Sequence, residues 1–346
     1  MSSSKTRKST DVEQLELEAK FKELELTLPK QLWFGFSFHN YQGFWCPTFI
    51  LKNVIAFQTH FEAQDTDIIL ASLPKTGTTW LKSLLYTILN RKSTSLHTIS
   101  QQVFQTKNPH ELVTSFEFNI YKNFNETQPD LSDLPSPRLF STHIPFLSLP
   151  DSIKSSKSRI VYVCRNPLDT FVSTWHFNLS FDTNKDMKSS TEMMEEYVDK
   201  FCTGLLRFGP YDSHLLEYWK EYLQNPDRIL FLEYEGLKKE PKAHLRKLAD
   251  FLSCPFSEEE ENENVVEEII KICSFQSLKE KDVNKNGKAV PIVENKHFFR
   301  KGEVGDWNND LTASMAKKLD QLLQGKLKEA GFSFTYYQPP EFGGYY

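Results

Sequence analysis

A turn that combines a lysine, a glycine and several threonines is the first segment of the sequence whose residue types could bind a charged ligand. It runs from Pro74 to Trp80 as PKTGTTW, after an apolar run and before residues at helical spacing. Backbone N–H groups at a helix start attract anions, and Gly77 lets a phosphate approach the main chain. Lys75 adds positive charge, and hydroxyl donors come from Thr76, Thr78 and Thr79. The turn predicts a phosphate site, the alternative being an ordinary glycine-containing turn between strand and helix.

The order of residues in this turn bears on the type of phosphate chemistry. Lys75 precedes Gly77, and no earlier glycine is present, unlike the triphosphate loop G-x-x-x-x-G-K-[ST]. The turn therefore gives no support to magnesium-dependent kinase chemistry.

A second cluster able to bind an anion follows the apolar run at 159–164. Arg165 comes directly after this run, and Ser173 lies further along the predicted helix. A guanidinium fork and a hydroxyl at a strand end suit bidentate phosphate binding. The alternative is that Arg165 only forms a salt bridge with Asp169.

A third pair of cations lies near the C-terminus. Arg300 and Lys301 precede Gly302 and follow a polar stretch at 281–297. Adjacent cations beside a glycine can clamp an anion, although arginine-lysine pairs are also common on surfaces. The polar stretch is predicted to be a loop that either closes over a site or only connects two elements.

One of the nine histidines, His143, stands in the sequence THIP after the apolar pair Leu139 and Phe140. A lone histidine is more often structural than catalytic. A neutral imidazole, with an ordinary pKa near 6.5, is nevertheless suited to accept a proton at pH 7.

Taken together, these segments resemble the plant cytosolic sulfotransferases over roughly residues 40–330. The resemblance rests on LPKTGTTWLK at 73–82, THIP at 142–145, CRNPLD at 164–169 and RKGEVGDW at 300–307, in the order of the family. It implies that a sulfuryl group is transferred from 3'-phosphoadenosine 5'-phosphosulfate (PAPS), a co-substrate, to a hydroxyl of a small organic molecule.

The resemblance also implies which residues bind the donor. The first turn would hold the 5'-phosphosulfate, Arg165 and Ser173 the 3'-phosphate, and the C-terminal signature would cover the 3'-phosphate. Residues 234 and 273–275 match positions that contact adenine and ribose. The implied donor-binding residues are Lys75, Thr76, Gly77, Thr78, Thr79, Trp80, Arg165, Ser173, Tyr234, Cys273, Phe275, Arg300, Lys301 and Gly302.

For catalysis, the resemblance implies that His143 takes the acceptor proton and that Lys75 stabilises charge on the bridging oxygen. Ser173 would hold Lys75 away until the acceptor is bound, and neither a metal nor a covalent intermediate is expected. The sequence departs from the family at two places. Ser141 stands where many animal relatives have a lysine, and Asn308 replaces the usual lysine after the C-terminal signature.

The elements that position these residues follow a repeated strand, turn and helix order. Apolar runs at 67–73, 159–164 and 228–234 predict buried strands, each followed by helical spacing, the third by the stretch 237–251. The pattern predicts an α/β fold, P-loop-like, with a central parallel sheet flanked by helices on both faces. Further helices are expected at 191–208, 212–224, 258–272 and 311–330.

Length and composition bound the remaining organisation. One domain is expected at 31–332, after an N-terminal arm at 1–30 with heptad-like apolar spacing and before a C-terminal tail at 333–346. The net charge of −5, without a basic half, argues against a nucleic-acid partner. The five scattered cysteines predict reduced thiols and no metal site.

Two further expectations concern location and assembly. The first thirty residues lack the apolar core of a signal peptide, and no apolar run is long enough to cross a membrane, so a cytoplasmic protein without membrane contact is expected. The dimer motif of animal relatives is nearly absent at 308–313, which favours a monomer and leaves a homodimer possible.

The acceptor is not determined by the sequence. Aromatic residues make up 14% of the chain, and the guesses for pocket walls are Tyr41, Phe146, Phe208 and Tyr211. Plant members act on flavonoids, steroids, hydroxyjasmonates or desulfoglucosinolates. The alternatives to a sulfotransferase are a nucleotide-dependent small-molecule kinase on a similar fold and a silent nucleotide-binding protein.

Overall fold

A parallel sheet forms the centre of the computed structural model, which describes residues 11–122, 129–181, 190–289 and 293–337. Its four strands lie in the order β5-β4-β6-β7. The strands are β4 (Ile68–Ser72), β5 (Leu139–Thr142), β6 (Arg159–Cys164) and β7 (Ile229–Glu233). Three of them confirm the strands expected from the sequence. The fourth, β5, was not expected, because its four residues end in Ser141 and Thr142 and leave only a short apolar run.

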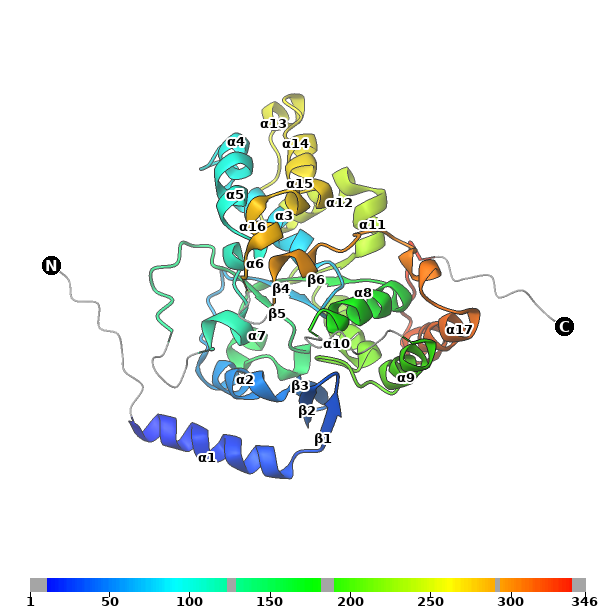
Figure 1. The fold of residues 1–346 in the computed structure, drawn as a ribbon. Helices are drawn as coiled ribbons and strands as arrows, with labels where there is room; N and C mark the ends of the chain where they lie inside the picture. Colours follow the sequence, from blue (N-terminus) through cyan, green and yellow to red (C-terminus); the bar gives the residue numbers. More distant parts are fainter. Residues whose placement is uncertain (1–10, 123–128, 182–189, 290–292, 338–346) are drawn as a thin grey trace.

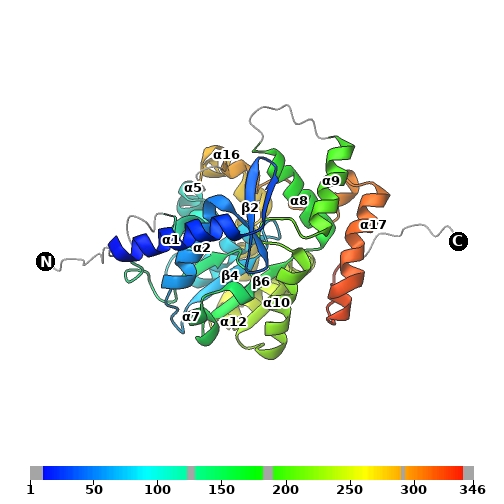
Figure 2. The same cartoon turned by 90° about the horizontal axis from the view of Figure 1, so that it is seen from below.

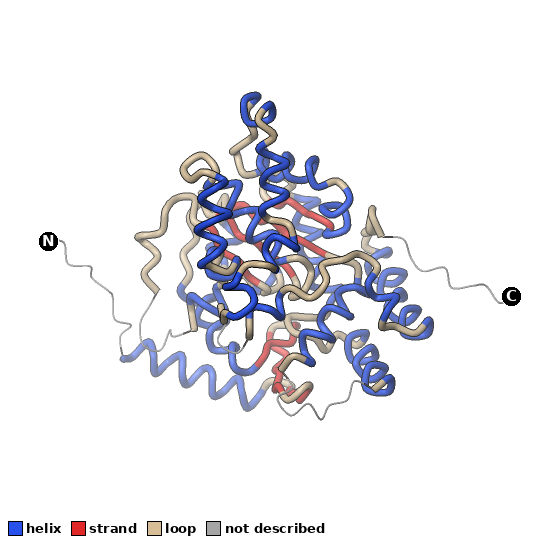
Figure 3. Tube along the Cα trace, turned by 45° about the horizontal axis from the view of Figure 1, so that its top comes forward, coloured by secondary structure: helices blue, strands red, loops and turns tan. Residues whose placement is uncertain are grey.

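Side chains of this sheet alternate between two cores. Ile69 and Ile160 belong to the core on one face, and Ile68 and Val161 to the core on the other. The first core includes residues of α2 (Thr48–His60), α8 (Pro167–Leu179) and α10 (Tyr211–Gln224). The second includes residues of α3 (Thr78–Asn90), α12 (Pro241–Phe251) and α14 (Val265–Ile272). Helices therefore cover both faces, which confirms the predicted α/β class (Figures 1 and 3).

A small antiparallel sheet near the N-terminus was not predicted. Its strands are β1 (Lys30–Trp33), β2 (Phe36–Tyr41) and β3 (Phe44–Pro47). Two-residue turns with positive φ, at 34–35 and 42–43, join them. Such turns match the twist of a tight hairpin, and each carries a glycine at its second position.

The segment 1–30, which was expected to be an N-terminal arm, contains helix α1 (Asp11–Thr27). Lys52 of α2 forms an ion pair with Glu18, and Figure 2 shows α1 alongside α2. Phe21 and Leu24 pack against the first core. At the other end of the chain, the backbone amide of Thr335 donates to Glu233, while residues 338–346 of the predicted tail lie outside the described residues.

Several predicted helices are interrupted by particular residues. The stretch 258–272 forms α13 (Glu258–Asn262) and α14, because Asn264 has a left-handed φ of 58°. The stretch 191–208 ends early as α9 (Thr191–Cys202), before Gly204 at φ 92°. The stretch 311–330 contains α17 (Ala313–Leu322) followed by a π-helical turn at Leu323–Leu327.

Two other expected segments also differ in detail. The stretch after β7 is divided into α11 (Tyr234–Lys239) and α12, because Pro241 begins a new helix. The stretch 281–297 was expected to be a loop, but it contains α16 (Asp282–Asn286). Residues 290–292 of that stretch lie outside the described residues.

The remaining elements are short. They are α4 (Leu96–Thr98), a π-helical turn (Ile99–Val103), α5 (Phe104–Thr106), α6 (Pro109–Leu112), a second π-helical turn (Phe116–Ile120), α7 (Asp151–Ser155), α15 (Phe275–Lys279) and 3-10 turns at Phe146–Ser148, Asn295–Phe298 and Asp306–Asn309. Within the ranges described, no helix combines the length and the apolar character needed to cross a membrane.

Candidate active site

A cavity of about 330 Å³ lies where the β4–α3 turn, helix α8 and the C-terminal signature meet. One side is lined by the cations and glycines singled out in the sequence. The other side is lined by aromatic rings from Phe49, Phe118, Phe177, Phe181, Phe208 and Phe298. A polar side beside an apolar side is suited to a charged donor and an organic acceptor.

The β4–α3 turn brings backbone amides to this cavity. Helix α3 begins at Thr78, after Gly77, whose φ of 120° is a conformation that other residues adopt poorly. A Cβ at Gly77 would lie 2.8 Å from the Tyr234 ring. Glycine therefore serves here both for the turn and for the close approach of Tyr234.

Lys75 lies in this turn with a positive φ of 72°. Its Nζ donates to the carbonyl oxygen of His297 at 3.3 Å and lies 4.1 Å from the centroid of the Phe177 ring. Burial, together with Arg300, Arg165 and Arg207, lowers the pKa of Lys75 to about 7. The ammonium is held beside other cations and has no carboxylate partner among the described residues.

Arg165 follows β6 and reaches the same cavity. One of its terminal nitrogens lies 3.3 Å from Asp169 and also donates to the carbonyl oxygen of Glu303. The salt bridge considered as the alternative is therefore present, and the guanidinium lines the cavity as well. Its buried Nε has no partner among the described residues.

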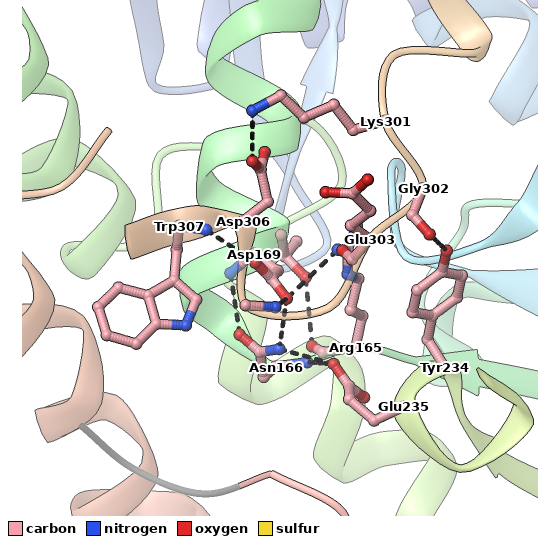
Figure 4. A network of polar contacts seen from close by, with 12 residues as sticks. Arg165, Asn166, Asp169, Tyr234, Glu235, Lys301, Gly302, Glu303, Asp306 and Trp307 are labelled. Atoms are coloured by element: carbon pink, nitrogen blue, oxygen red, sulfur yellow. Dashed lines mark hydrogen bonds and ion pairs between the residues drawn. The ribbon is translucent and has the colours of Figure 1, made fainter. Parts of the chain in front are cut away.

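Asp169 connects helix α8 to the C-terminal signature (Figure 4). Its carboxylate accepts hydrogen bonds from the backbone amides of Gly305 at 2.9 Å and Trp307 at 3.1 Å. Its side chain is fully buried, so these bonds are protected from water. From the sequence, Asp169 was expected only as a partner of Arg165, and this role was not predicted.

Arg300 and Lys301 both pair with Asp306, at 2.6 and 2.5 Å. Both line the cavity, as does Gly302, whose carbonyl oxygen accepts a hydrogen bond from the Tyr234 hydroxyl at 2.8 Å. The buried Nε of Arg300 has no partner among the residues that the structure describes. Arg165 and Arg300 both line the cavity, and two guanidinium groups there fit an anion with several oxygens, such as a phosphate.

His143 lies after β5 and lines the cavity. Its Nδ1 is 2.7 Å from the carbonyl oxygen of Ser72, which can only accept, so Nδ1 carries the proton. Burial lowers the pKa of His143 to about 4. The imidazole is therefore neutral at pH 7, with Nε2 unprotonated.

Buried groups around His143 fix its place. The backbone amide of His143 donates to Glu117 at 2.8 Å, and the carbonyl oxygen accepts from His214 Nε2 at 3.0 Å. His214 is oriented in turn by Tyr162, 3.0 Å from its other ring nitrogen. Neither Glu117 nor His214 was found by sequence reasoning, because these contacts join segments far apart in the chain.

A second buried group borders the side of the cavity that the cations line. Lys82 Nζ lies 3.1 Å from His110 Nδ1, and His110 Nε2 lies 2.9 Å from the Thr79 hydroxyl. Lys82 donates to Nδ1, so Nε2 of the neutral ring donates to Thr79. This leaves the Thr79 proton free to point at an anion in the cavity.

Most of the predicted donor-binding residues line this cavity. The exceptions are Thr76, whose hydroxyl donates to the carbonyl oxygens of Leu73 and Val163, and Cys273, whose sulfur lies 3.3 Å from the Thr87 hydroxyl. Both side chains are buried outside the lining. Their part in donor binding stays a prediction.

Ser173 also lines the cavity, but the described residues include no hydrogen bond between it and Lys75.

Of the four guesses for pocket walls, only Phe208 lines the cavity. Tyr41, Phe146 and Tyr211 pack in the core; the Tyr211 hydroxyl, for example, donates to the carbonyl oxygen of Arg165 at 2.6 Å. Across the described part of the chain, no group of histidine, cysteine or carboxylate side chains is arranged to hold a metal ion.

Comparisons with known proteins agree with this geometry. A family model described as a sulfotransferase domain matches residues 65–331. The chain is 42% identical to "Cytosolic sulfotransferase 15" of Arabidopsis thaliana over 333 residues, which cover 95% of this chain and 91% of the relative.

Solved structures give the same result. A sulphotransferase of Arabidopsis thaliana superposes with a TM-score of 0.72 at 37% identity, covering 93% of this chain and 97% of the other. The mouse sulfotransferase SULT7A1, crystallised with PAP, superposes with a TM-score of 0.61 at 26% identity, covering 84% and 95%.

The fold and the anion-binding cavity define a group-transfer enzyme with a phosphorylated nucleotide donor. The chain belongs to the sulfotransferase family. It is an enzyme of the PAPS-dependent type, and its acceptor is a small molecule.

Proposed function

We propose that His143 is the general base that activates the acceptor hydroxyl. The observation that supports this is the 2.7 Å contact between His143 Nδ1 and the Ser72 carbonyl oxygen, which leaves Nε2 as the proton acceptor. The pKa of about 4 keeps this nitrogen available at neutral pH. His143 would take the proton as the acceptor oxygen bonds to sulfur.

The other bond change in the same step is cleavage between sulfur and the bridging oxygen of the 5'-phosphate. Lys75 would neutralise the charge that gathers on that oxygen, and the amides after Gly77 would steady the surrounding oxygens. The products are the sulfated acceptor and 3',5'-bisphosphoadenosine (PAP). Ser173 is proposed to restrain Lys75 until the acceptor is bound.

The donor's 3'-phosphate is proposed to lie between Arg165, Ser173 and the signature segment at 300–302. The guanidinium groups of Arg165 and Arg300 line the cavity and would supply N–H donors there. Trp80 and Tyr234, whose rings meet edge to face at 5.7 Å, offer apolar surfaces for the adenine together with Phe275.

The aromatic side of the cavity is proposed to bind a flavonoid, steroid, hydroxyjasmonate or desulfoglucosinolate. Each class needs only to present a hydroxyl to His143. The rings of Phe208 and His143 lie 5.5 Å apart, so an apolar acceptor body resting on Phe208 would place its hydroxyl beside the base.

The test is a transfer assay with sulfur-labelled PAPS and one member of each acceptor class, beside ATP with Mg²⁺. We expect labelled product with PAPS as the donor and no product with ATP and Mg²⁺. The acceptor class with the highest kcat/KM identifies the acceptor. Phosphorylated product from ATP would instead support the kinase alternative. PAP binding without transfer to any class would support the silent binding protein.

We propose further that the enzyme is a cytosolic monomer. The relatives are named cytosolic sulfotransferases, and the dimer motif of animal members is nearly absent after Trp307. Light scattering on the purified chain should give the monomer mass, near 40.4 kDa. Twice that mass would indicate the homodimer.

A further inference from the structure

One cation of the cavity has no anionic partner among the residues that the structure describes. Arg207 lines the cavity beside the aromatic rings, and its side chain has no hydrogen bond or ion pair with any described residue. Its guanidinium carbon lies 4.8 Å from the ring centroid of Phe36, 5.0 Å from that of Phe181 and 5.9 Å from that of Phe177. Ring faces attract a cation but accept none of its five N–H groups in a directed bond.

Every other arginine in the described ranges has an oxygen acceptor. The pairs are Arg91 with Glu260, Arg138 with Asp67, Arg159 with Ser253, Arg165 with Asp169, Arg228 with Glu221, Arg246 with Glu261 and Arg300 with Asp306. Arg207 differs from all of them, because within the described ranges its guanidinium is paired with aromatic rings and with no oxygen acceptor.

Among the lining residues of the cavity, no carboxylate compensates the charge of Arg207. Burial lowers its pKa to about 10, so it remains charged at pH 7. Its charged neighbours in the cavity, which include Lys75 and Arg165, are cations too. A partly buried guanidinium among cations and rings is suited to pair with an anionic group of a ligand.

The position of Arg207 favours the acceptor over the donor as the source of that group. It precedes Phe208, whose ring faces His143, and it contacts Phe36 of β2 and Phe181 beyond α8. The proposed phosphate-binding groups come from other segments, at 75–80, 165–173 and 300–302.

The distance between Lys75 and Arg207 sets the length of an acceptor that reaches both the transfer site and Arg207. An upper limit for this distance follows from the ring of Phe177, which lies near both side chains. Lys75 Nζ and the Arg207 guanidinium carbon lie 4.1 and 5.9 Å from the centroid of Phe177, so they are at most 10.0 Å apart. A molecule with a hydroxyl at the transfer site and an acidic group at Arg207 therefore needs only a short apolar body.

We propose that Arg207 determines specificity by binding a carboxylate of the acceptor, so that the preferred acceptors are hydroxy acids. The proposal rests on the sulfotransferase function proposed above and narrows its acceptor. Among the four classes named, the hydroxyjasmonates are carboxylic acids, while the parent flavonoids, steroids and desulfoglucosinolates carry no carboxylate.

The experiment compares matched acids and esters with the full chain at saturating PAPS. The probes are a hydroxyjasmonate and 3-(4-hydroxyphenyl)propanoate, each beside its methyl ester. Wild type should prefer the acid in kcat/KM by about 10- to 100-fold, the size expected for a charge-assisted pair. Arg207→Gln should bring the ratio of acid to ester in kcat/KM close to one, by lowering kcat/KM for the acid far more than for the ester, and Arg207→Lys should restore part of the preference.

Two control measurements separate this role from structural or donor-binding roles. The melting temperature of Arg207→Gln should change little, because the lost contacts with the aromatic rings are offset by removal of a charge that has no anionic partner among the described residues. The Kd for PAP should stay within about twofold of wild type. A raised Kd for PAP with an unchanged acid-to-ester ratio would assign Arg207 to the donor and overturn the proposal.

Other outcomes distinguish this proposal from the function on which it rests. Transfer to a flavonol or steroid, with esters accepted as well as acids, would refute the role of Arg207 and leave the sulfotransferase function intact. Absence of both PAP binding and transfer to any acceptor would refute the function itself.

Discussion

The lowered pKa of Lys75 predicts that donor binding takes up a proton. In the free enzyme, burial and the neighbouring cations lower this pKa to about 7. A phosphate or sulfonate beside the ammonium reverses these effects and raises the pKa toward its ordinary value of 10.5. Above pH 7, Lys75 is therefore mostly neutral before binding and charged afterwards.

The size of the effect follows from the two pKa values. A group with a pKa of about 7 is roughly nine-tenths deprotonated at pH 8 and one-tenth at pH 6. Lys75 should thus contribute an uptake of about 0.9 proton at pH 8, and the association constant should fall about tenfold per pH unit above 7.5. Phosphate monoesters, with a second pKa near 6, are already ionised at pH 8 and contribute little.

The assay is isothermal titration of PAP into the enzyme at pH 8, in two buffers with different ionisation enthalpies. Lys75→Met should lose about 0.9 of the proton uptake. Lys82→Met is the comparison variant, because the pKa of Lys82 is also lowered to about 7 but its side chain reaches the cavity only through His110; it should lose less of the proton uptake than Lys75→Met. Equal uptake by wild type and Lys75→Met would refute the reasoning.

Two further substitutions test how the cavity is built. Asp169→Asn replaces a carboxylate oxygen that accepts from Gly305 or Trp307 with an NH₂ group, which cannot accept these hydrogen bonds. The Kd for PAP, measured by titration, should therefore rise about tenfold or more. An unchanged Kd would contradict the role of this carboxylate. Gly77→Ala places a Cβ 2.8 Å from the Tyr234 ring at φ 120°, which should lower stability by about 1–3 kcal/mol in urea unfolding. Gly35→Ala, at φ 71° with no atom within 4 Å, is its control and should cost less; equal losses would assign the effect to φ alone.

The parts of the fold that were predicted are those with a strong local signal. Strands β4, β6 and β7 are nearly continuous apolar runs that end at a turn. The β4–α3 turn carries its own glycine and lysine in sequence. Strand β5 has only four residues, so its place at the edge of the sheet is decided by pairing with β4, which a local pattern does not show.

The helix boundaries that were missed depend on single residues. Asn264 adopts a left-handed φ and separates α13 from α14, although the sequence pattern runs through it. Pro241 separates α11 from α12, and this signal was present in the sequence. The hairpins of the N-terminal sheet also had a signal, in Gly35 and Gly43 between aromatic stretches.

The site residues that were predicted lie in short sequence motifs. Those that were missed contact segments far away in the chain, which no local pattern shows. His143 and Lys75 lie in short motifs and both line the cavity. Glu117 and Asp169 position backbone groups 26 and 136 residues away in the chain. Arg207 carries no motif, and only its aromatic surroundings single it out.

The central claim is that this cavity transfers a sulfuryl group from PAPS to a hydroxyl with His143 as the base. The most direct measurement is single-turnover transfer of labelled sulfuryl by wild type and by His143→Ala, with PAP affinity determined on the same samples. The variant should bind PAP as wild type does and transfer at least about 100-fold more slowly. Equal transfer rates at equal affinity would contradict the claim.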